Sequence, residues 1–117
     1  MLQALAPRFR LGVVTNGIDR VQRSRLAASG LVPFFETIVT SQGCGYAKPD
    51  PRILHVALDA LAVAPQQAVY VGDDPAVDGA AASAAGVRFI WMDRGHPVRG
   101  RRPRSRIAHL SELAKRL

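Results

Sequence analysis

The sequence has little of what would place it outside a reducing compartment or within a membrane. It holds one cysteine in 117 residues, Cys44, which excludes an internal disulfide and makes the cytoplasm the expected location. No apolar run approaches about 18 residues, so no transmembrane helix is expected. The first residues, "MLQALAPRFRLGVV", lack the charged region, apolar region and cleavage site of a secretory signal.

Acidic residues are also scarce, and the resulting positive charge is unevenly placed. Nine acids face sixteen basic residues, giving a formal charge of +7 and a pI near 11.0. The segment "RGHPVRGRRPRSR", residues 94–106, holds six arginines and no acid, and without these six the charge falls to +1. A basic segment can bind phosphate backbones, but this one has no interleaved aromatic residues and no groove-reading motif. We therefore expect a solvated loop, and no nucleic-acid partner.

The chain is long enough for one domain, and its sequence pattern predicts an α/β fold. With 48% apolar residues it can form one core, and too little sequence remains for a second ordinary domain. Four short apolar runs alternate with helix-like segments: "RLGVVTNG", "FETIVTS", "QAVYVGD" and "GVRFIWMDRG". Near-continuous apolar strands separated by helices predict a mostly parallel sheet of about four strands, covered on both faces.

The helices are predicted from their boundary residues. Asp19 is expected as the N-cap of a helix that stops at Gly30, and Asp50 as the N-cap of a helix with Pro51 at its first position. Asp74, followed by Pro75, repeats that device before an alanine-rich helix that stops at Gly86. The last segment, "IAHLSELAKRL", has apolar residues at helical spacing and predicts a closing amphipathic helix over 107–117.

Three polar side chains fall where strands are expected to end. Thr15 ends the first run, Asp73 ends the third, and Lys48 lies in the loop after the second. Ligands of open parallel sheets bind outside the carboxyl ends of the strands, so these groups should meet there. A hydroxyl and an ammonium stabilise phosphate oxygens, and carboxylates bind Mg²⁺. The competing explanation is that acids simply favour a helix N-terminus, which accounts well for Asp74 but poorly for Asp73.

The stretches "VVTNG", "KPDPRIL" and "VGDDPAVDGAAASAAG" resemble, in order and spacing, the second, third and fourth motifs of the haloacid dehalogenase-like hydrolases. The resemblance covers nearly the whole chain and implies a partial Rossmann-like core that spans 1–117. It implies Mg²⁺-dependent hydrolysis of a phosphate monoester on a small molecule. The implied site residues are Thr15 and Asn16 on the phosphoryl group, Lys48 neutralising its charge, Asp73 and Asp74 at the metal, and Asp78 in the metal shell or orienting Lys48.

The sequence departs from the family at its start. Family members begin with an aspartate-rich strand whose leading aspartate is the nucleophile, whereas this chain has no acid before Asp19. The resemblance therefore implies a truncated core domain that is inactive alone. The alternative is a non-catalytic module that binds phosphate, Mg²⁺ or a protein.

The missing strand would lie at the centre of the sheet, between "LGVVT" and "AVYVG", and its absence would expose two apolar edges. Three remedies are open: these two strands pair directly, a second copy of the chain fills the gap, or a separate N-terminal piece fills it.

Overall fold

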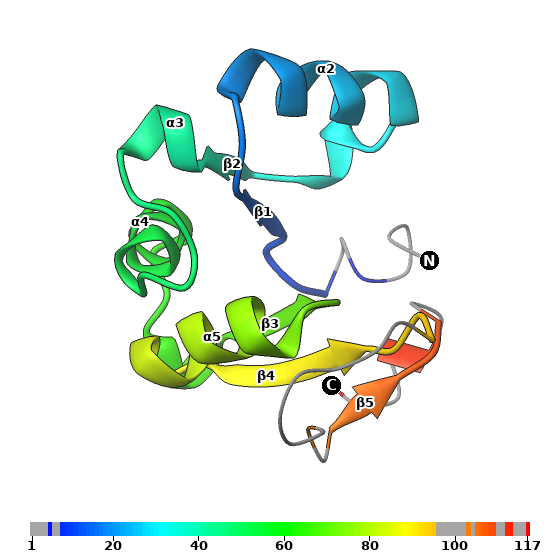
Figure 1. Ribbon diagram of the computed structural model, residues 1–117. Coiled ribbons are helices and arrows are strands. Elements are labelled where there is room, and N and C mark those ends of the chain that lie inside the picture. The colour runs from blue at the N-terminus through cyan, green and yellow to red at the C-terminus, as the bar shows by residue number, and fades with distance from the viewer. Residues whose placement is uncertain (1–4, 6–7, 96–102, 104, 110–111, 114–116) are drawn as a thin grey trace.

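The computed structural model describes residues 5, 8–95, 103, 105–109, 112–113 and 117. Parallel strands alternate with helices, as the apolar runs predict (Figure 1). The strands are β1 Gly12–Thr15, β2 Thr37–Thr40, β3 Val69–Gly72, β4 Arg88–Met92 and β5 Arg106–Ile107. The α-helices are α2 Asp19–Ser29, α3 Ser41–Cys44, α4 Arg52–Leu61 and α5 Ala80–Ala85. Short turns of other helix types are η1 Val32–Phe34, η2 Pro65–Gln67 and the π-helical η3 Pro75–Gly79.

The strands form two sheets rather than one. β1 pairs with β2, with Val14 opposite Val39, and β3, β4 and β5 form a second sheet in that order. All of these pairings are parallel. Within the described residues, β1 and β3 do not pair with each other, so direct pairing of the strands that flank the gap is not the arrangement found. The α/β class and the parallel strands are confirmed, and the sheet is divided at the expected place.

Two apolar clusters lie on opposite faces of β3 and β4, because successive side chains of a strand point to opposite faces. Tyr70 and Phe89 pack on the cluster built mainly by α4, α5 and β2. Val69 and Val71 pack on a second cluster. The buried members of the first are Val39, Ile53, Leu54, Ala57, Leu58, Ala81, Ala82, Ala85 and Val87. Those of the second are Leu5, Ile90, Met92, Ile107 and Leu113.

Some helix boundaries differ from those expected. Ile18 is the N-cap of α2, and Asp19 is its first residue, because the Asp19 carboxylate accepts a hydrogen bond from the Thr40 hydroxyl instead of a backbone N–H. α4 begins at Arg52, one residue after its expected first position at Pro51. Asp50 nevertheless accepts the N–H of Arg52, which is the bond an N-cap carboxylate makes.

The helical segment formed by η3 and α5 begins and ends at the residues that its sequence predicts. Asp74 is the N-cap of η3 and accepts the N–H of Ala76. Gly86 ends α5 with φ +75°, a conformation that glycine adopts without steric cost.

The predicted closing helix over 107–117 is wrong for its first three residues, because Ile107 is in a strand and Ala108 and His109 form bends. Ile107 lies in β5 opposite Met92 and is fully buried, and its carbonyl accepts the N–H of Asp93. Strand pairing next to β4 therefore overrides the helical spacing there. Much of the predicted helix, most of the arginine-rich segment and most of the N-terminal stretch lie outside the described residues. In the part of the chain that the structure describes, no helix is long and apolar enough to span a membrane.

Candidate functional site

An ion pair between Lys48 and Asp78 lies at the carboxyl end of β3. The Lys48 Nζ is 2.7 Å from Oδ1 of Asp78, and the two side chains are 12% and 6% exposed. The second carboxylate oxygen of Asp78 accepts the N–H of Asp74. Room for this carboxylate exists because Gly72 has no side chain: a Cβ there would lie 2.6 Å from Cγ of Asp78.

Tyr70 is the third member of this cluster. Its hydroxyl lies 2.9 Å from the Lys48 Nζ, from which it accepts a hydrogen bond, and it donates to the carbonyl of Val14 in β1 at 3.2 Å. Burial alone would lower the pKa of Lys48, but its hydrogen bonds with Asp78 and Tyr70 raise that pKa above its ordinary value. Burial raises the pKa of the Tyr70 hydroxyl, against the opposing effect of Lys48. The lysine is therefore charged and the tyrosine neutral across the physiological range.

The Lys48 loop is fixed to the end of β1 by Asn16. The Asn16 side chain accepts the backbone N–H of Lys48 at 2.8 Å and donates to its carbonyl at 3.1 Å. Thr15 immediately precedes it, half-buried, with its hydroxyl 3.3 Å from the Asn16 carbonyl. Both residues expected to contact a phosphoryl group thus lie beside the lysine, and Asn16 also positions that lysine.

A second polar network supports the turn after β1. The Ser41 hydroxyl accepts the N–H of Gly17, and the fully buried Thr40 donates to Asp19 while accepting the N–H of Gly43. These bonds fix the start of α2 against the end of β2. Because the same turn carries Thr15 and Asn16, the network holds one side of the site in place.

The two carboxylates expected at a metal are exposed and make different contacts. Asp73 is exposed at the end of β3, and its backbone carbonyl accepts the indole N–H of Trp91. Asp74 caps η3. Within the described residues, no three acidic, histidine or cysteine side chains converge as a metal-binding group. Mg²⁺ keeps several waters and takes one or two carboxylates, so Asp73 fits part of its coordination sphere, and the remaining ligands would come from other groups.

The structure thus brings Thr15, Asn16, Lys48 and Asp78 together, with Asp73 and Asp74 at the edge of the same region. Sequence reasoning missed Tyr70 and Gly72. Tyr70 and Gly72 lie two apart on β3 and share the face that meets Asp78. Asp73 shares its face with Val71, so its position at the strand end did not point to these two residues.

Comparison with known proteins identifies the family. Residues 1–92 match the family described as haloacid dehalogenase-like hydrolase. The chain belongs to this family. It is 45% identical over 85 residues to a phosphoserine phosphatase of Thermus thermophilus, covering 73% of this chain and 34% of the relative. It is 39% identical over 115 residues to a phosphoglycolate phosphatase of Rhodospirillum rubrum, covering 97% of this chain and 45% of the relative.

Solved structures of this hydrolase family have the same fold. A phosphatase of the family from Thermococcus onnurineus superposes with a TM-score of 0.90 at 31% identity, over 97% of this chain and 53% of its own. The Bacillus subtilis hydrolase YfnB, solved bound to magnesium, gives a TM-score of 0.89 at 28% identity, over 97% of this chain and 51% of its own. The chain spans about half the length of these structures, and between about a third and a half of the sequence relatives described above.

Proposed function

We propose that this chain supplies the phosphoryl- and metal-binding half of a Mg²⁺-dependent phosphomonoesterase of the haloacid dehalogenase-like family. The observation that carries the proposal is the buried Lys48–Asp78 pair at the carboxyl ends of β1 and β3, held beside Thr15 and Asn16. Relatives named as phosphatases of phosphoserine and phosphoglycolate support the same chemistry. They differ in substrate, so only the class, a phosphate monoester of a small molecule, is proposed here.

The lysine has one donor to spare for a substrate. Its bonds to Asp78 and Tyr70 are 2.7 and 2.9 Å, whereas its third contact, to the Val14 carbonyl, is 3.5 Å and weak. A phosphoryl oxygen can therefore take that third N–H without breaking the ion pair. Thr15 and Asn16 follow one another at the end of β1, and their hydroxyl and amide groups would donate to further phosphoryl oxygens.

Each acidic residue then has a distinct role. Asp78 keeps the Lys48 ammonium charged and aimed, while Asp73, with Asp74 beside it, would hold Mg²⁺. The metal would neutralise phosphoryl charge and orient the group for attack. Attack itself needs a nucleophile, and no acidic residue precedes Asp19 in this sequence. We therefore expect this chain alone to bind phosphate and Mg²⁺ but not to turn over a monoester.

The test is calorimetric titration of the chain with Mg²⁺ and inorganic phosphate, beside a turnover assay with p-nitrophenyl phosphate. Mg²⁺-dependent phosphate binding should weaken about tenfold or more in Lys48→Met and Asp73→Asn. Asp59→Asn, which removes an exposed carboxylate of α4, is the matched control and should bind as the wild type does. Absence of any phosphate binding would overturn the binding role. Turnover by the chain alone, lost in Asp73→Asn, would overturn its dependence on an external nucleophile.

A further inference from the structure

Asn16 is the only asparagine in the 117-residue sequence, and a glycine follows it. In an Asn–Gly sequence the backbone nitrogen of the glycine can attack the side-chain amide carbon of the asparagine, because glycine has no side chain to hinder the approach. A five-membered succinimide ring forms, and the amide nitrogen leaves as ammonia. The bond most prone to spontaneous deamidation in this sequence therefore lies directly after β1, beside Lys48.

The turn after β1 needs both of these residues. Gly17 has φ +141°, where a side chain is strained, and a Cβ there would lie 2.5 Å from Nε2 of Gln22. Asn16 must both accept the N–H of Lys48 and donate to its carbonyl, and an amide side chain can do both, whereas an ionised carboxylate only accepts. The labile dipeptide is thus a consequence of how the turn holds the Lys48 loop.

The folded chain restrains both reacting groups. The N–H of Gly17 donates to the Ser41 hydroxyl at 2.8 Å, and the same hydroxyl lies 3.3 Å from the Gly17 carbonyl. Attack requires this nitrogen to lose its proton and to approach the amide carbon of Asn16, and the bond to Ser41 opposes the loss of that proton. The amide itself is bonded to both backbone groups of Lys48. Because Asn16 is exposed to water, these bonds are its protection.

Asp78–Gly79 is the one other bond in the sequence at which a succinimide could form through glycine. Asp78 is buried within η3, and both of its carboxylate oxygens are bonded, one to Lys48 and one to the N–H of Asp74. An ionised carboxylate is also a poor electrophile. Asn16 is therefore the reactive position of the two.

We propose that Asn16 is a deamidation site of the folded protein, that Ser41 sets its rate, and that the product releases the Lys48 loop from the end of β1. The Gly17 nitrogen gives its proton to water or hydroxide and bonds to Cγ of Asn16, and ammonia leaves. Water then opens either C–N bond of the succinimide to give aspartate or isoaspartate. Water is the only co-reactant. The reaction proceeds from the fraction of molecules in which the Ser41 bond is open.

Neither product can hold the Lys48 loop as asparagine does. In the aspartate product a carboxylate oxygen replaces the N–H donor that lies 3.1 Å from the Lys48 carbonyl, so two acceptors face each other. In the isoaspartate product the main chain gains a methylene between Thr15 and Gly17, which displaces the side chain from its partner. Either product also adds a negative charge at this end of β1.

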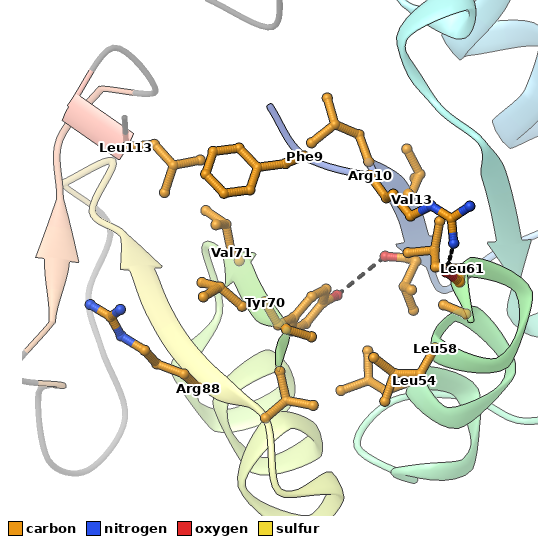
Figure 2. Close-up of a pocket in the computed structure, with 18 of the residues that line it drawn as sticks. Phe9, Arg10, Val13, Leu54, Leu58, Leu61, Tyr70, Val71, Arg88 and Leu113 are labelled. Carbon is orange, nitrogen blue, oxygen red and sulfur yellow. Dashed lines mark hydrogen bonds between the residues drawn. The ribbon is translucent and has the colours of Figure 1, made fainter. Parts of the chain in front are cut away.

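The loop released in this way is the one that aims Lys48. Its side chain lines a cavity of about 850 Å³ between β1 and β3. Tyr70 reaches into the cavity from β3, and its hydroxyl bonds to the Val14 carbonyl (Figure 2). The ammonium of Lys48 is held by Tyr70 and Asp78, while the backbone of the same residue is held by Asn16. Deamidation would thus loosen the lysine without altering any group that touches its ammonium.

The test ages the folded 117-residue chain at mildly alkaline pH and follows its intact mass. Conversion of one amide to one acid should be seen, and Asn16 is the only asparagine that can supply it, since glutamine cyclises much more slowly. A protease that cleaves before aspartate but not before isoaspartate places the change at residue 16 and separates the two products. The chain in urea is the reference, and it should deamidate faster than the folded chain.

A matched pair of serine variants tests the role of Ser41. Ser41→Ala removes the acceptor of the Gly17 N–H and should raise the deamidation rate roughly two- to tenfold, as expected for one lost hydrogen bond. Ser29→Ala removes a hydroxyl that bonds to the Leu26 carbonyl at the far end of α2 and should react as the wild type does. Equal rates in the two variants would overturn the role of Ser41.

Hydrogen exchange of the Lys48 amide tests the release of the loop. This amide should exchange about fivefold faster in the deamidated protein and in Asn16→Asp than in fresh wild type. The amide of Ile90 in β4 should exchange at an unchanged rate and is the internal control. Unchanged exchange at Lys48 in the deamidated protein would overturn the proposed consequence.

The remaining outcomes also decide the proposal. Should Ser41→Ala fail to fold, Gln22→Leu removes the bond to the Asn16 carbonyl at 3.0 Å and should accelerate deamidation in the same way. If the folded chain keeps its amide while the chain in urea loses it, Asn16 is not a deamidation site of the folded protein. None of these measurements uses phosphate, Mg²⁺ or turnover, so their failure is separable from failure of the proposed function.

Discussion

The carboxylate of Asp78 lies 2.7 Å from the ammonium of Lys48, a residue thirty positions earlier in the chain, and both side chains are almost fully buried. The lysine comes from the loop before α4, and the aspartate from the π-helical turn after β3. Their meeting places a charged, oriented donor at the carboxyl ends of β1 and β3. Each group depends on the other, since either charge left alone in this position would be costly.

Gly72 should be intolerant of a side chain for this reason. In Gly72→Ala, the new Cβ would lie 2.6 Å from Cγ of Asp78, and this carboxylate is held on both sides. We expect a loss of about 2–3 kcal/mol in the free energy of unfolding, measured by urea denaturation. We also expect weaker phosphate binding by the same variant, measured by calorimetry.

Gly45→Ala is the control for that substitution. Gly45 has a positive φ of +86°, which Gly72 does not, and nothing lies within 4 Å of its added Cβ. Its cost should be about 1–2 kcal/mol from backbone strain alone, with phosphate binding unchanged. Equal losses of phosphate binding in the two variants would contradict the steric explanation.

Tyr70→Phe should separate the hydroxyl from the packing of the ring. The hydroxyl bonds to Lys48 and to the Val14 carbonyl, whereas the ring packs against Phe89 at 6.4 Å between centroids. Loss of the hydroxyl should reduce the free energy of unfolding by about 1–2 kcal/mol. The Lys48 ammonium and the Val14 carbonyl would each lose a buried hydrogen-bond partner. Thermal or urea unfolding would show this. Unchanged stability would mean that water replaces the hydroxyl fully.

Much of the fold can be predicted from the sequence because its strands are near-continuous apolar runs. Each of the four runs contains a strand, and Asp74 and Gly86 bound their helical segment as local rules require. The two-residue β5 could not be predicted, because Ile107 also fits a helical apolar pattern and only its pairing with Met92 decides its conformation.

The sequence predicts which residues gather at the site better than it predicts the contacts between them. Strand-end positions and the family resemblance put Thr15, Lys48 and Asp73 in one region. They did not reveal that Asn16 binds the backbone of Lys48, since that depends on the path of a loop 32 residues away. From the sequence, Tyr70 is only a residue of an apolar strand. Its hydroxyl reaches the Val14 carbonyl because β1 and β3 face each other without pairing, which the sequence does not reveal. The assignments of metal and phosphoryl ligands stay predictions.

Stability should fall at alkaline pH through Lys48 and Tyr70. The pKa of each is raised in the folded chain above its ordinary value of 10.5 and 10.0, respectively. The folded state then holds more protons than the unfolded state as pH rises through these values, so the free energy of unfolding decreases with pH. The contribution is fully present below about pH 10 and is lost as the pH passes the folded-state values. Urea unfolding between about pH 9 and pH 11 should show a steeper decline in the wild type than in Lys48→Met.

The Lys48–Asp78 ion pair should contribute little to the free energy of unfolding and much more to phosphate binding. Asp78→Asn leaves the Lys48 ammonium buried without its counter-charge and should cost about 3 kcal/mol in the free energy of unfolding. The double variant Lys48→Met, Asp78→Leu removes both charges and should recover most of that loss, since apolar replacements of a buried pair are often neutral. Phosphate binding should be lost in both variants. Urea unfolding and calorimetric titration of the two, beside Asp59→Asn, would test this, and a double variant as unstable as Asp78→Asn would show that the pair itself holds this part of the fold together.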